Sequence, residues 1–208
     1  MPLPIHPKRG IYMNEVEIQS KIKQNAKNVG IVLTIGKILV VFVIVLLFLT
    51  AALTACIYTV GGSAEFSHWI VSEDVLSSFG IGTSVPAGMD PTTAFIQAFA
   101  IFLVSATVYL LIFAGMIWAA ARIFAEIREN GVPFTQANAR SLKHVAICMA
   151  LLCVVPVITD SIGWYITGIS VTLGYLSIEG LIVAAVLYCL AHIFEYGTLL
   201  QKQADETL

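Results

Sequence analysis

Two carboxylates in an otherwise apolar part of the chain are the residues best suited to chemistry. Asp160 and Glu179 are the only Asp, Glu, Lys or Arg residues between Val145 and Phe194. A charge inside a membrane span costs about 3 kcal/mol on insertion scales, which makes such a residue a functional candidate by default. The pair could bind a cation or relay protons. Alternatively, Asp160 lies at the membrane interface and Glu179 faces the other helices, where Ser, Thr or Tyr hydroxyls hydrogen-bond to it.

No familiar catalytic motif accompanies these carboxylates. The sequence lacks Gly-x-Ser-x-Gly, a phosphate-binding loop, a dinucleotide fingerprint and His-Glu-x-x-His. The cysteines fall inside apolar stretches and form no Cys-x-x-Cys or Cys/His cluster; they are Cys56, Cys148, Cys153 and Cys189. We therefore predict a protein without catalytic activity, metal or cofactor. The net charge of -2 argues neither for nor against nucleic acid, and no direct contact with nucleic acid is predicted.

The composition predicts the elements that position Asp160 and Glu179. Of the 208 residues, 58% are hydrophobic and only 12% are charged, a far more apolar balance than that of soluble domains. A helix needs about 20 apolar residues to cross the hydrocarbon core. Four continuous stretches reach that length, at about 38–60, 94–121, 145–162 and 171–194. Because a spanning segment must satisfy its own backbone hydrogen bonds in lipid, we predict an all-α membrane protein, a four-helix transmembrane bundle.

The distribution of lysine and arginine predicts how this bundle is oriented. All eleven lie in three segments, which are residues 1–37, the middle connection 122–144 and the tail 195–208. The other two connections, 61–93 and 163–170, contain none. Because positive charges stay on the cytoplasmic side, we predict that both termini and the middle connection are cytoplasmic and that the other two connections are external.

The N-terminal segment is expected to differ from the rest of the chain. Residues 1–28 are predicted to be a cytoplasmic segment ahead of a transmembrane domain at 29–208. Within it, Asn14–Asn28 is weakly amphipathic and compatible with a surface helix. Either Met1 or Met13 is the start of translation.

Two further features leave alternatives open. The external connection 61–93 is long for a structureless loop, so it either folds over the helices or carries function. Gly163 with Gly168, and Gly174 with Gly180, do not have the Gly-x-x-x-Gly spacing of close helix dimers. A homo-oligomer is therefore neither predicted nor excluded by the glycine pattern.

Two of the predicted cytoplasmic segments resemble a known family. The middle connection contains Glu129-Asn130-Gly131-Val132-Pro133-Phe134-Thr135, followed by Asn138-Ala139-Arg140. The tail contains Phe194-Glu195-Tyr196-Gly197, then Leu200-Gln201 and Asp205-Glu206-Thr207-Leu208. Together with four spans in this order, from about Lys21 to the C-terminus, the chain resembles the bacterial four-helix membrane family catalogued as domain of unknown function 2975. One departure is Lys202-Gln203-Ala204, where the family more often has an acidic residue, and this weakens any role for tail charge.

The resemblance implies a location and a partner. Members of this family are often encoded beside a small helix-turn-helix regulator of the Cro/CI type. By resemblance, the chain is then a multi-pass protein of the bacterial cytoplasmic (inner) membrane that sequesters, or signals to, such a cytoplasmic regulator. The candidate partner-binding residues come from both segments: Gly131, Pro133, Phe134, Asn138, Arg140, Gly197, Gln201, Asp205 and Glu206.

The residues of the two segments also allow simpler interpretations. Gly131 and Pro133 favour a turn, and Thr135 or Asn138 could cap the next helix. Phe134 either docks on the bundle or meets a partner. The whole turn could serve only to pack the helix ends, with the tail solvated. The alternative function is a small transporter or channel subunit that uses the intramembrane carboxylates described above.

Overall fold

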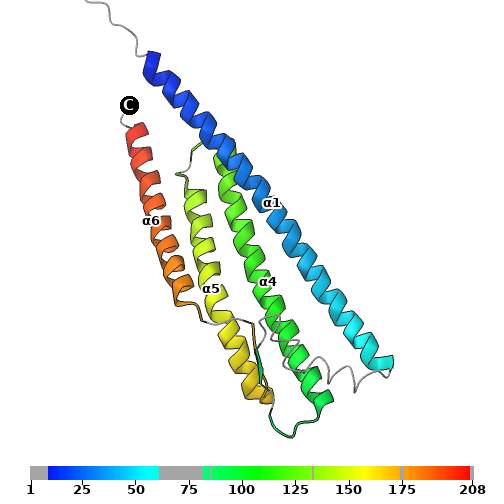
Figure 1. Ribbon diagram of the computed structural model, residues 1–208. Coiled ribbons are helices and arrows are strands. Elements are labelled where there is room, and N and C mark those ends of the chain that lie inside the picture. The colour runs from blue at the N-terminus through cyan, green and yellow to red at the C-terminus, as the bar shows by residue number, and fades with distance from the viewer. Residues whose placement is uncertain (1–8, 61–81, 85, 133, 174–175, 207–208) are drawn as a thin grey trace, which may run out of the picture.

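Four long helices make up most of the protein. The computed structural model describes residues 9–60, 82–84, 86–132, 134–173 and 176–206. The elements in these ranges are α1 (Arg9–Val60), β1 (Gly82–Ser84), α4 (Pro91–Asn130), α5 (Gln136–Thr167), β2 (Ser170–Thr172) and α6 (Ile178–Glu206) (Figure 1). Each of the four helices is long and apolar enough to cross a membrane. The predicted all-α, four-helix membrane fold is confirmed.

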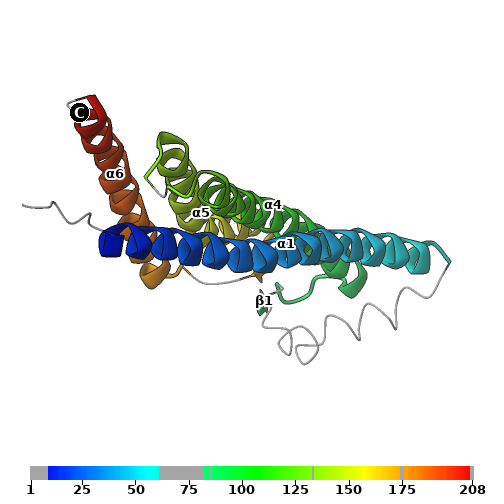
Figure 2. The same ribbon diagram turned by 90° about the horizontal axis from the view of Figure 1, so that it is seen from above.

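The helices lie side by side in chain order. Their main contacts join α1 to α4, α4 to α5 and α5 to α6, so α1 and α6 are the outer members of the row (Figures 1 and 2). Each outer helix therefore packs mainly through one face. Such an open arrangement suits a membrane, because lipid tails solvate apolar side chains about as well as another helix does.

Two predicted helix boundaries differ from the structure. The predicted surface helix and first span are one continuous helix, the 52-residue α1, about 78 Å long at 1.5 Å per residue. No proline interrupts it. The predicted start of the fourth span at Val171 is wrong, because Val171 lies in strand β2 and α6 begins only at Ile178. The tail also departs from expectation, since α6 continues as a helix to Glu206.

Strand β2 is part of a small cap on one end of the bundle. It pairs antiparallel with β1, with Thr83 opposite Val171. Behind the strands, a buried cluster joins the sheet to α4; it consists of Ala94, Ala98, Ile169 and Val171. Of the two alternatives for the connection 61–93, its described part, 82–84 and 86–90, folds over the helices.

The opposite end of the bundle carries the predicted site. The start of α1, the turn between α4 and α5, and the end of α6 lie together there (Figure 1). We call this the basic end, because the lysines and arginines of the described residues, apart from Lys37 near the middle of α1, lie in or near these three regions. In Figure 1, α1 and α6 extend beyond the α4–α5 turn.

Candidate functional site at the basic end

The turn between α4 and α5 depends on a glycine. Gly131 ends α4 with a left-handed backbone, φ +68°, and its N–H donates to the carbonyl of Ile127 at 2.9 Å. A Cβ at this position would lie 2.9 Å from Cε of Lys23, which reaches over from α1. The left-handed backbone favours glycine, and the flexible end of the Lys23 side chain would have to shift to admit a Cβ. The turn predicted at Gly131 is confirmed, while Pro133 lies outside the described residues.

The next helix begins with the predicted cap. The Thr135 hydroxyl accepts a hydrogen bond from the Asn138 N–H at 3.1 Å, which satisfies one of the unpaired donors at the start of α5. The Asn138 residue itself is only 1% exposed. Of the two predicted caps, Thr135 is the one used, and Asn138 is packed between helices rather than displayed on the surface.

Phe134 adopts one of its two predicted roles: it docks on the bundle. Its ring centroid lies 4.9 Å from that of Phe194 on α6. A Cβ added to Gly197 would lie 3.3 Å from the Phe134 ring, so the glycine leaves the surface on which this ring rests. The residue remains 44% exposed. The turn thus ties α6 to the α4–α5 pair.

We expect Phe134→Ala to lower the free energy of unfolding by about 1.5 kcal/mol, because an aromatic pair contributes ~0.5–1.5 kcal/mol beyond its buried area and half of this ring is already exposed. Thermal unfolding in detergent measures the change. Phe42→Ala is the matched control, since Phe42 is 58% exposed on the outer face of α1 and its loss should cost far less. Equal unfolding temperatures for the two variants would contradict the docking role.

An ion pair fastens α5 to α6 beside this ring. Lys143 Nζ lies 2.8 Å from Glu195 Oε2, and the Nδ1 atom of His192 lies 3.5 Å from the same oxygen. This pair was not predicted from the sequence, because its members are 52 residues apart. The signal in the sequence was a pair of opposite charges on one side of the membrane, with Lys143 just before the third predicted span and Glu195 just after the fourth.

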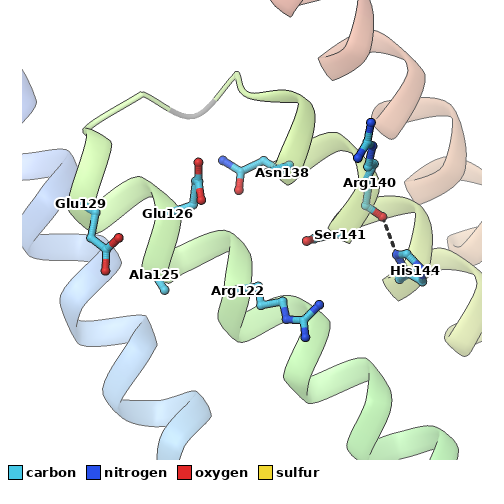
Figure 3. A pocket seen from close by; sticks show the side chains of 9 residues that line it. Arg122, Ala125, Glu126, Glu129, Asn138, Arg140, Ser141 and His144 are labelled. Carbon is cyan, nitrogen blue, oxygen red and sulfur yellow. Dashed lines mark hydrogen bonds between the residues drawn. The ribbon is translucent and has the colours of Figure 1, made fainter.

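A polar pocket of about 430 Å³ opens between α4 and α5 below the turn. Glu126 and Asn138 point toward one another across it, and Arg122 on α4 and Ser141 on α5 line it further from the turn (Figure 3). His144 Nδ1 donates to the carbonyl of Arg140 at 2.9 Å. The pocket is therefore lined by positive and negative side chains that can donate and accept hydrogen bonds. Its histidine is hydrogen-bonded to the backbone of its own helix.

The remaining candidate residues of the tail are displayed on α6. Gln201 is exposed, and Glu206 lies 3.8 Å from Lys202 one turn earlier. The backbone of Asp205 belongs to the same helix. Sequence reasoning missed an apolar surface on this part of α6, formed by the exposed side chains of Tyr196, Leu199 and Leu200. The i, i+3, i+4 spacing beyond the predicted end of the span was the signal that could have found it.

The two intramembrane candidates, Asp160 and Glu179, lie at the other end of the bundle and are not brought together. Asp160 accepts hydrogen bonds from residues of β2, so its described role is to hold that strand. Glu179 is exposed in the first turn of α6 and is not well inside the helix, because α6 begins at Ile178 and not at the predicted position 171. There its charge complements the helix dipole. No hydrogen bond between described residues joins Asp160 to Glu179.

The fold and this site define an all-α multi-pass membrane protein. The α4–α5 turn, the ion pair between α5 and α6 and the polar pocket lie together at its basic end. Within that class, the chain belongs to the family described as "Protein of unknown function (DUF2975)", which matches residues 81–208, or 128 of 208 residues. The resemblance drawn from the two segments is thus confirmed, although the match begins after α1 rather than near Lys21. No curated protein and no solved structure matches the chain.

Proposed function

We propose that this protein is a non-enzymatic regulatory partner in the bacterial cytoplasmic membrane. With both termini in the cytoplasm, it sequesters or releases a small helix-turn-helix regulator at the basic end. The family resemblance supplies the class of partner. One observation carries the proposal: α6 continues as a helix past the predicted end of its span and displays an apolar face there.

That apolar face has the form of a docking helix. Tyr196 is 63% exposed, Leu199 57% and Leu200 49%. Residues at i, i+3 and i+4 lie on one side of a helix, and such a stripe is what a hydrophobic groove on a partner receives. Lys202 and Glu206, one and two turns further on, are rim charges that select the partner more than they strengthen the complex.

The turn between α4 and α5 supports this surface from behind. Phe134 rests on Phe194 and Gly197, at the level of α6 where the apolar face begins. The Lys143–Glu195 ion pair holds the same level of α6. These contacts fix the direction in which the end of α6 leaves the bundle, so a partner meets a preordered helix and loses less conformational entropy on binding.

The proposal predicts that replacing both leucines of this face with aspartate, Leu199→Asp with Leu200→Asp, will lower recovery of the regulator at least about tenfold, since two charges cannot enter an apolar groove without a large desolvation cost. The measurement is affinity purification of the tagged protein from solubilised membranes, with a small helix-turn-helix regulator of the Cro/CI type as the probe. Deleting Ala204–Leu208 should weaken recovery to a smaller extent.

Tyr165→Asp is the matched control, because Tyr165 is 91% exposed at the opposite end of the bundle. It should leave recovery of the regulator unchanged. A reporter fused after Leu208 checks the orientation and should be active in the cytoplasm. Full recovery of the regulator by the double leucine variant, or a reporter active only outside the cell, would overturn the proposal.

A further inference from the structure

A second concave surface at the basic end lies between α1 and α4, on the outer side of the row. Its upper part is a cavity of about 360 Å³ whose lining includes Lys27, Lys37 and Arg128 and no Asp or Glu. None of the ion pairs between described residues involves these three cations. The surface therefore carries uncompensated positive charge.

The lower part of this groove is apolar. A cavity of about 210 Å³ continues along the same two helices and shares Lys37 with the upper one. Val40 and Ile44 of α1 face Leu111 and Trp118 of α4 across it. A basic upper cavity that meets an apolar lower cavity matches a molecule with an anionic head and a hydrocarbon tail.

The depth of the groove matches the membrane interface. Lys27 and Lys37 are ten residues apart on α1, or about 15 Å along its axis. Side chains on a helix tilt toward its N-terminus, so the Lys37 ammonium is directed toward the basic end and away from the apolar part of the groove. The distance between the two lysines exceeds the headgroup layer, which is ~5–8 Å thick on each side of the hydrocarbon core, so Lys27 lies at the headgroups when Lys37 lies at the edge of the hydrocarbon. Basic pockets between transmembrane helices are suited to anionic headgroups.

We propose that this groove binds one anionic phospholipid from the surrounding membrane. The lipid phosphate lies between Lys27 and Arg128, Lys37 lies deeper where the two cavities meet, and one acyl chain follows the apolar part between α1 and α4. Because α1 packs mainly on α4, a lipid in this groove adds contacts to the least buried helix of the protein. The inference does not depend on the regulator proposed above.

Gly30 allows the site to be blocked without changing its charge. It lines the upper cavity, and a Cβ placed on it would meet no atom within 4 Å. Gly30→Leu therefore fills the groove while the helix keeps its fold, and leucine also favours the helix more than glycine does. Lys27→Gln with Arg128→Gln removes charge and leaves the shape. The two variants test separate properties of one site.

The experiment compares thermal unfolding of the full chain in vesicles of pure phosphatidylcholine and in vesicles containing one third phosphatidylglycerol. The unfolding temperature of the unaltered protein should rise by several degrees with phosphatidylglycerol. Both variants should lose most of that rise. Lys202→Gln, which removes an exposed charge at the end of α6, should keep it. Native mass spectrometry should show one retained phosphatidylglycerol, absent from the variants.

Three results would overturn the proposal. The first is an equal rise in the unaltered protein and both variants, which would mean general surface charge effects. The second is the same stabilisation by inorganic phosphate alone, which would identify a simple anion site. The third is a dimer that Gly30→Leu dissociates without any dependence on phosphatidylglycerol, which would show that a second copy covers the groove.

Discussion

Replacing Asp160 with alanine is expected to lower the free energy of unfolding by about 3 kcal/mol. Its Oδ1 atom accepts from the Ser170 hydroxyl at 2.6 Å and from the Val171 N–H at 2.9 Å. Its Oδ2 atom lies 3.4 Å from the Thr172 hydroxyl. Hydrogen bonds to a charged group contribute ~1.5–3 kcal/mol each, and Asp160→Ala leaves the N–H of buried Val171 without this acceptor.

Asp160→Asn separates hydrogen bonding from charge. The amide oxygen of asparagine can still accept from Ser170 and Val171, but its NH₂ group cannot accept from Thr172. We expect Asp160→Asn to lower the free energy of unfolding, but by less than Asp160→Ala does. Ser161→Ala is the neighbouring control, because the Ser161 hydroxyl donates only to a carbonyl of its own helix.

Hydrogen exchange locates the effect. The amides of residues 169–172 should exchange faster in Asp160→Ala, while those in the middle of α4 should change little, because a local opening of the small sheet does not unfold the helices. Thermal unfolding in detergent gives the accompanying stability. If both exchange and stability match those of Ser161→Ala, the carboxylate does not hold β2.

The second large effect is expected at the contact between α5 and α6. Gly180→Ala should lower the free energy of unfolding by about 2 kcal/mol, although alanine is ~1 kcal/mol better than glycine inside a helix. The new Cβ would overlap with Sγ of Cys153 and lie 3.2 Å from the Ser177 hydroxyl. Because Cys153 is buried, its sulfur has little room to move, and overpacking of this kind costs ~1–3 kcal/mol.

A compensating substitution makes this expectation specific. Cys153→Ala removes the sulfur, so the double variant with Gly180→Ala should recover most of the lost stability and give a coupling energy of at least ~1 kcal/mol in a double-mutant cycle. Gly30→Ala is the control, since no atom lies within 4 Å of its Cβ position, and it should be neutral or stabilising. Additive effects of the two substitutions at Gly180 and Cys153 would show that they do not share this contact.

Several features of the basic end followed from local sequence. Gly131 was expected in a turn, and its left-handed backbone is one that few other residues tolerate. Thr135 was one of two residues expected to cap the next helix, and its hydroxyl accepts from the N–H of a residue three positions on. Both depend on interactions within a few residues. The docking of Phe134 on α6 was one of two alternatives, since a single exposed aromatic residue gives no sign of which surface it meets.

The start of α6 shows where apolar character is ambiguous. Val171 was assigned to a span, yet it lies in a strand of the small cap, with Ile169 buried beside it. A side chain buried in a protein cluster and one buried in lipid are equally apolar, so hydropathy cannot distinguish them. Because the strand was not predicted, Asp160 was considered either part of a polar pathway or a residue at the membrane interface, and not an acceptor for β2.

By itself, the sequence determined that the chain forms four membrane-length helices, because the length of an apolar stretch and the need to satisfy backbone hydrogen bonds in lipid are properties of each segment alone. It also determined the turn at Gly131 and the family. Only the tertiary structure decided which distant residues meet. The Lys143–Glu195 pair, the strand held by Asp160 and the basic groove between α1 and α4 all join segments far apart in the chain, and their partners are selected by how the helices align in space.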